Sequence, residues 1–166
     1  MNHRLIIRTS VLFFAAALAA TSLGAVAGCG GDKRLSREEF SDRLQSIDQR
    51  GEERWGRLAQ RAQNLKPDQP LGADVAQLMS AVVEFQRQAV GELEELNPPE
   101  GAEEEVKKLI GALRERTKTF ERVIGAGRFT QREGDRITQS GDKIDKAFEQ
   151  LRKEGFLPKV EEHAEE

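Results

Sequence analysis

The sequence predicts an all-α protein: an antiparallel up-down-up-down four-helix bundle that follows an N-terminal signal helix. Charged residues make up 33% and apolar residues 37% of the 166 residues, which favours solvent-exposed helices around one core. Aromatic residues are only 5% and tyrosine is absent, a poor composition for a sheet. Beyond residue 36, apolar residues recur at alternating spacings of four and three, the period of left-handed bundle packing.

The first 28 residues have the features of a secretory signal peptide. Arg4 and Arg8 form a positive start without acidic residues, residues 11–20 are wholly apolar, and small residues follow. This order of a basic, an apolar and a small-residue region is typical of a segment that is removed from the mature protein. We therefore leave residues 1–28 out of the fold prediction.

The signal ends in a recognisable motif. Val26-Ala27-Gly28-Cys29, "VAGC", resembles the lipobox of bacterial lipoproteins. The resemblance implies cleavage between Gly28 and Cys29, a diacylglycerol on the Cys29 sulfur and attachment to the extracytoplasmic face of the membrane, with no other cofactor. Two or more acyl chains make such attachment stable. Residues 29–35 then form a flexible tether.

Two other interpretations of this region exist. The apolar stretch from Val11 to Gly28 is about 18 residues long, near the lower limit for crossing a bilayer, so it could be an uncleaved anchor. A catalytic role for Cys29 would need a nearby base, and His163 is the one histidine beyond the signal. We favour the lipid anchor over both.

The charge balance argues against a nucleic-acid partner. Residues 1–28 hold two of the 26 basic residues and none of the 29 acidic ones, which leaves 24 against 29 and a net charge of −5. A basic patch is therefore not indicated. Residues 158–166 are acidic and are expected to form a disordered tail.

The first two helices are expected over 36–65 and 72–96, at the start of a bundle domain that spans 36–157. Ser36 and Glu39 have the spacing of a capping box. Core positions are expected at Phe40, Leu44, Ile47, Gly51, Leu58, Ala62 and Leu65 in the first helix and at Val75, Leu78, Val82, Phe85, Ala89, Leu93 and Leu96 in the second.

The other two helices are expected over 99–125 and 131–154. The sequence "NPPEG" is expected to end the second helix, because the residue before a proline is disfavoured in the helical conformation. Pro99 suits the first turn of the next helix. Thr130 and Glu133 form a second capping box. The core positions are Val106, Leu109, Ile110, Leu113, Thr117, Phe120 and Ile124 in the third helix and Ile137, Gly141, Ile144, Phe148 and Leu151 in the fourth.

Helix ends and surfaces agree with this assignment. Gly155 is expected in the left-handed conformation that ends a helix. Acidic and basic residues at four-residue spacing indicate a solvated surface. These pairs are Glu39–Arg43, Glu53–Arg57, Glu103–Lys107, Glu104–Lys108, Asp142–Lys146 and Glu149–Lys153.

One internal layer suggests a site. Gly51 and Gly141 lack side chains in the apolar stripes of the first and fourth helices, which are neighbours in an up-down bundle. Trp55 follows Gly51 by one turn, so the indole either fills the notch or lines a pocket for a small apolar ligand with Gly51, Phe85 and Gly141.

No catalytic or metal-binding motif was found. The chain lacks a Glu-x-x-His repeat, a phosphate-binding loop, a nucleophile elbow and a zinc-protease motif. The layout, with "RLSREEF" opening the first helix and "LNPPE" after the second, is similar to small helical lipoproteins of high-GC Gram-positive bacteria. We expect a non-catalytic lipoprotein with a partner in the envelope. A carrier of an apolar ligand is the alternative, and an enzyme is third.

Overall fold

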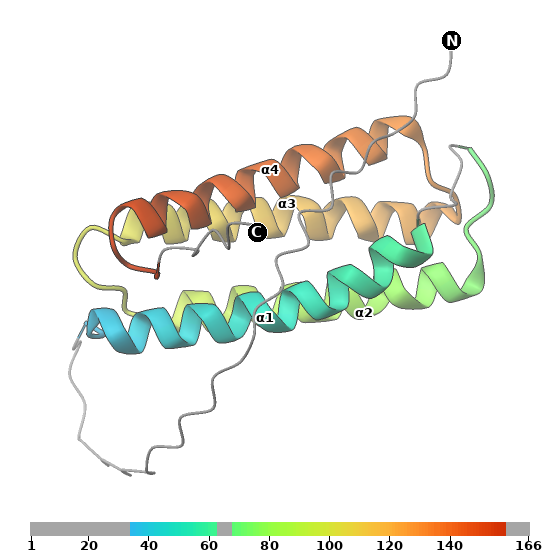
Figure 1. The fold of residues 1–166 in the computed structure, drawn as a ribbon. Helices are drawn as coiled ribbons and strands as arrows, with labels where there is room; N and C mark the ends of the chain where they lie inside the picture. The colour runs from blue at the N-terminus through green and yellow to red at the C-terminus, as the bar shows by residue number, and fades with distance from the viewer. Residues whose placement is uncertain (1–33, 63–67, 159–166) are drawn as a thin grey trace, which may run out of the picture. The chain divides into compact units, whose positions relative to one another are not determined.

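The computed structural model of the chain describes residues 34–62 and 68–158. Their helices are α1 (Arg37–Ala62), α2 (Ala73–Glu95), α3 (Glu103–Ala126) and α4 (Gln131–Lys153) (Figure 1). The all-α prediction is confirmed. In the described part of the chain, no helix is long and apolar enough to span a membrane. The expected signal peptide, with Gly28 and Cys29, and the tail from residue 159 onward lie outside the described residues.

Consecutive helices run antiparallel and pack against each other, α1 on α2, α2 on α3 and α3 on α4 (Figure 1). The start of α1, the α2–α3 connection and the end of α4 meet at one end of the bundle. There the Leu35 backbone N–H donates to the Asn97 carbonyl at 2.8 Å. The Phe156 ring packs edge-on against Phe40, with centroids 6.2 Å apart. The residues before α1 and after α4 are thus fixed to the same end.

At the opposite end, the chain entering α2 is bonded to the chain between α3 and α4. The Asp68 N–H donates to the Phe129 carbonyl at 2.7 Å, and the Leu71 N–H donates to the Gly127 carbonyl at 2.8 Å. An isolated antiparallel bridge joins Pro70 to Arg128 between them. These bonds tie the two loops into one unit.

Local caps begin and end the helices largely where the sequence indicates. The Glu39 N–H donates to Ser36 Oγ at 3.2 Å, and the Ser36 N–H donates to Glu39 Oε2 at 3.1 Å. Thr130 and Glu133 form the same reciprocal pair at the start of α4. Gly155, with φ = 76°, adopts the expected left-handed conformation, which costs glycine little.

The first turn expected for the third helix is not helical. α3 begins at Glu103 rather than Pro99, because Gly101 has φ = 94°, which no helix residue adopts. The Ala102 N–H closes a turn onto the Pro99 carbonyl at 3.1 Å, and the Gly101 N–H donates to Glu103 Oε2 at 2.8 Å. The other boundaries lie within a residue of expectation, except that α1 is described only to Ala62.

The core consists of two clusters of buried side chains along the bundle. The larger one lies toward the end where α1 starts and includes Phe40, Leu44, Leu93, Leu109 and Leu151. The smaller one lies toward the tied loops and includes Leu58, Met79, Val82, Phe120 and Val123. Most expected core positions are buried. Those only partly buried are Gly51, Ala62, Leu78, Ile110, Ile124 and Gly141, and Leu65 lies outside the described residues.

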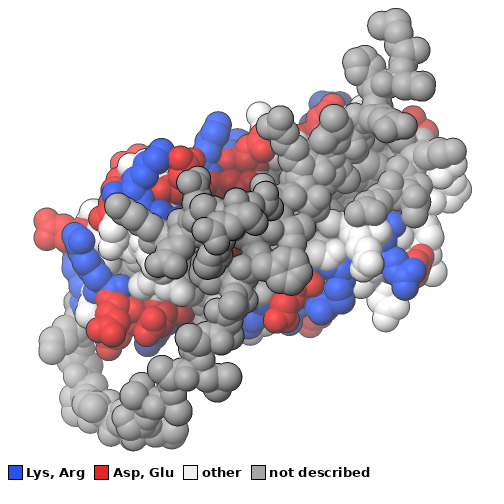
Figure 2. All heavy atoms as spheres, viewed as in Figure 1, with Lys and Arg blue, Asp and Glu red and all other residues white. Residues whose placement is uncertain are grey.

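Ion pairs join the helices that pack directly. Arg50 bonds both carboxylate oxygens of Glu92 between α1 and α2, at 3.1 and 2.6 Å. Arg87–Glu121 and Lys143–Glu115 span the next two helix pairs, at 2.8 and 2.6 Å. Among the expected intrahelical pairs, Glu104–Lys108 and Glu149–Lys153 form, and Glu103 pairs with Arg34. Where the face in Figure 2 is not drawn in grey, basic and acidic side chains are interspersed, as on a solvated surface.

Candidate functional site between α1 and α4

The fourth helix pair differs from the other three. No Cα atom of α1 lies within 8 Å of a Cα atom of α4, whereas each of the other antiparallel pairs comes closer. The ion pair between Arg152 and Asp48, 3.8 Å apart, crosses this distance. We call five charged residues on this side of the bundle the charged cluster: Asp48 and Glu52 from α1, Arg116 from α3, and Asp145 and Arg152 from α4.

A buried polar chain leads from the core to this cluster. Gln86 of α2 and Thr117 of α3 are both buried, and Thr117 Oγ1 lies 2.9 Å from the Gln86 amide and 2.8 Å from the Leu113 carbonyl. A hydroxyl has one proton, and the Leu113 carbonyl can only accept it. The Gln86 NH₂ group therefore donates to Thr117, and its oxygen accepts from Arg116 Nε at 2.7 Å and Nη2 at 3.1 Å.

Arg116 is the deepest cation of the cluster. Its guanidinium carbon lies 5.1 Å from the centre of the Trp55 ring, an arrangement in which the ring quadrupole attracts the charge. Burial lowers the pKa of Arg116 to about 10, and the negative charge of Asp145 opposes this shift. Among the described residues, no carboxylate lies within 4 Å of this guanidinium. Trp55 and Gln86 are the described partners of this guanidinium.

Asp48 is the most perturbed carboxyl group. Burial, followed by the negative charge of Glu52, raises the pKa of Asp48 to about 6; Arg152 acts in the opposite direction and Asp145 adds to the rise. The Arg152 guanidinium lies 3.8 Å from Asp48 Oδ2, at the outer limit of an ion pair. Burial also raises the pKa of Asp145 above its ordinary range. This side of the bundle can therefore take up a proton in mildly acidic solution.

The structure brings together only part of the expected ligand layer. Gly51 lies against Phe85: a Cβ added at Gly51 would be 3.1 Å from Phe85 Cε1. Trp55 instead packs beside Phe120, with ring centroids 6.1 Å apart, and a Cβ added at Gly141 would meet no atom within 4 Å. The Phe85 ring, rather than the indole, fills the notch at Gly51. The apolar ligand pocket beside Trp55 stays a prediction.

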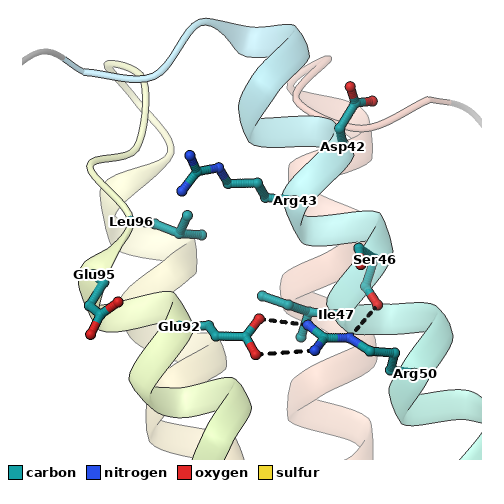
Figure 3. A pocket seen from close by; sticks show the side chains of 8 residues that line it. All are labelled: Asp42, Arg43, Ser46, Ile47, Arg50, Glu92, Glu95 and Leu96. Carbon is teal, nitrogen blue, oxygen red and sulfur yellow. Dashed lines mark hydrogen bonds and ion pairs between the residues drawn. The ribbon is translucent and has the colours of Figure 1, made fainter. Parts of the chain in front are cut away.

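Two surface hollows lie elsewhere and are lined by charged side chains. The hollow between α1 and α2 is floored by Ile47 and Leu96, with Arg43 extending into it and the Arg50–Glu92 pair across it (Figure 3). A second hollow between α3 and α4 is floored by small residues and rimmed by lysines and glutamates. In the described ranges, no three metal-binding side chains come together.

Sequence reasoning missed the charged cluster. Asp48 and Glu52 are four residues apart, so like charges repel along α1, which is unfavourable on an ordinary helix surface. Trp55 continues the same stripe by three residues. Two acidic residues and a tryptophan directly beside the apolar stripe were the sequence pattern that could have indicated this cluster. The partner Arg116 could not be assigned because its reach across the bundle depends on the distance between helices.

No family model, no curated protein and no solved structure matches this chain.

Proposed function

We propose that this chain is a lipid-anchored lipoprotein of the extracytoplasmic face of a bacterial membrane, and that its bundle binds an envelope partner without catalysing a reaction. The observation that carries the proposal is the "VAGC" motif at residues 26–29, at the end of a basic and then apolar N-terminal region. A thioether-linked diacylglycerol on Cys29 would attach the chain to the membrane.

The chain between Cys29 and the bundle is short. Leu35 is bonded to Asn97 at the end of the bundle where α1 starts, so only six peptide steps separate Cys29 from a fixed backbone point. Six extended residues span at most about 20 Å. A lipid on Cys29 would hold this end of the bundle beside the membrane and direct the tied loops at Asp68–Leu71 and Gly127–Phe129 away from it.

A binding role is favoured over ligand transport. The aromatic residues of the expected pocket already have protein contacts: Phe85 lies on Gly51 and under the guanidinium of Arg54 at 4.7 Å. Trp55 is held by Arg116 and Phe120. The hollows of the surface are lined by charged groups, which suit recognition of a polar protein surface better than uptake of an apolar molecule.

The anchor is tested with the full chain expressed in a bacterium that processes lipoproteins. Intact mass of the purified wild type is expected to show loss of residues 1–28 and the gain of an acyl-modified cysteine. Cys29→Ala is expected to lose both changes, and Ser22→Ala, which leaves the motif intact, is expected to keep them. A wild-type mass equal to that of the unprocessed chain would overturn the anchor proposal.

The binding part has its own test. A photo-crosslinking amino acid is placed in turn at exposed positions on the tied loops and on the outer faces of α2 and α4 in cells. One envelope protein should crosslink from neighbouring positions and not from the opposite face. Adducts of equal yield from every face, or none, would contradict a specific partner.

A further inference from the structure

Asp48 of the charged cluster lies in the contact between α1 and α4, where its side chain is 31% exposed and 3.8 Å from the Arg152 guanidinium. Other acidic groups add repulsion: Glu52 and Asp145 disfavour the charge on Asp48, and Asp142 disfavours the charge on Asp145. Asp48 is the least exposed of these four carboxyl groups. The contact joins the two helices whose backbones stay furthest apart among the antiparallel neighbours.

We propose that the contact between α1 and α4 is a proton-controlled joint, closed when Asp48 is protonated and widened when Asp48 is charged. Repulsion between charges of one sign falls when water enters, because the dielectric constant there rises. Separation of the helices hydrates Asp48 and relieves its repulsion from Asp145. A neutral Asp48 removes this drive and lets α1 approach α4.

The charge on Asp48 is influenced by charged groups on its own helix and on the helices packed beside it. On α1 itself Glu52 disfavours its charge, and on α4 Asp145 disfavours it while Arg152 favours it. From α3, Arg116 acts on Asp145 rather than directly on Asp48. His3 and His163 lie outside the described residues, so loss of the transition in Asp48→Asn, rather than an absence of histidine, assigns it to this cluster.

Trp55 is a built-in reporter of the joint. It is the only tryptophan of the chain, tyrosine is absent, and its indole contacts Arg116 of the cluster. The full chain in detergent is titrated between pH 4.5 and 8 while the emission maximum, acrylamide quenching and far-ultraviolet circular dichroism are recorded. Emission is expected to move to longer wavelength and quenching to increase as pH rises, with a midpoint near pH 6 and an unchanged helical signal.

Substitutions of the acidic and basic residues around Asp48 distinguish this joint from a general effect of pH on the protein. Asp48→Asn is expected to hold the short-wavelength emission over the whole range, whereas Asp42→Asn, an exposed control on the same helix, keeps the transition. Arg152→Gln is expected to shift the midpoint upward and Glu52→Gln to shift it downward, since the two charges act on Asp48 in opposite senses.

Three outcomes would overturn the proposal: a wild-type emission maximum that does not move with pH, a transition that survives in Asp48→Asn, or a transition that coincides with loss of the helical signal. Shifts of Arg152→Gln and Glu52→Gln in the same direction would also overturn it. None of these outcomes depends on the lipid anchor, because all are read from the bundle.

Discussion

The guanidinium of Arg152 lies 3.8 Å from the carboxylate of Asp48, and this is the ion pair that the structure gives between α1 and α4. The corresponding pairs in the other three helix contacts are at 2.6 to 2.8 Å. Asp48 is also only 31% exposed, so its charge is poorly solvated and poorly paired at the same time. The stability of the bundle should therefore depend on whether Asp48 is ionised.

Asp48→Asn is expected to stabilise the bundle at neutral pH. The pKa is raised from 3.8 to about 6 on folding, so the cost of the charge is absent below pH 3.8, grows between the two values and is complete above pH 6. The full shift corresponds to roughly 3 kcal/mol, and partial exposure reduces this to about 1 kcal/mol. Urea unfolding at pH 7.5 and pH 4 measures it; an equal difference from wild type at both values would contradict the assignment.

Substitution by alanine should change the thermal stability differently at two glycines in the middle of helices. At Gly141 the new Cβ meets nothing within 4 Å, so the gain in helix propensity, about 0.8 kcal/mol, should appear in full. At Gly51 the Cβ would lie 3.1 Å from Phe85 Cε1, and displacement of that ring should offset the gain. Thermal unfolding of Gly141→Ala and Gly51→Ala measures the difference, and a larger increase for Gly51→Ala would contradict the described packing.

The buried hydroxyl of Thr117 should contribute more to the free energy of unfolding than that of Ser140. Thr117→Val keeps the side-chain shape but leaves the Gln86 NH₂ group without its acceptor, which should cost about 1 to 3 kcal/mol. Ser140→Ala removes only a bond to the Ile137 carbonyl at 2.8 Å and should cost less than about 1 kcal/mol. Equal losses in chemical unfolding would show that the Gln86 bond contributes nothing.

The ion pair between Arg50 and Glu92 should contribute measurably, although it is at the surface. It is bidentate and both side chains are about one-third exposed, so a double-mutant cycle with alanine should give a coupling of about 0.5 to 1 kcal/mol that weakens in salt. Arg87–Glu121 has one contact and an arginine that is 68% exposed. Its coupling is expected near zero, and the reverse order would contradict this ranking.

Features set by neighbouring residues could be predicted from the sequence. The capping boxes at Ser36 and Thr130 need only residues three positions apart, and the apolar stripes need only the helical period. The start of α3 could not be predicted in the same way. Pro99 is compatible with a first turn, but the Phe156 ring lies 3.5 Å from a Cβ position built at Gly101, where the chain turns with positive φ.

The charged cluster depends on distances that no local pattern contains. Asp48 has the same sequence surroundings as an exposed helix residue, and its altered pKa follows from burial and from charges on α1 and α4. Arg116 would lie on the surface of an isolated α3. Its contact with Trp55 joins α3 to α1, which are not consecutive in the up-down order, so no pattern within either helix indicates it.

The loops tied by the Asp68 and Leu71 hydrogen bonds also limit how α1 can move. The residues before α1 are bonded to Asn97 at one end, and the loop that leads into α2 is bonded to Phe129 and Gly127 at the other. α1 is thus held directly at its start, whereas residues 63–67 lie between its described end at Ala62 and the bonded loop, which limits that end less. Amide exchange at positions inside α1 should therefore be faster in its second half than in its first.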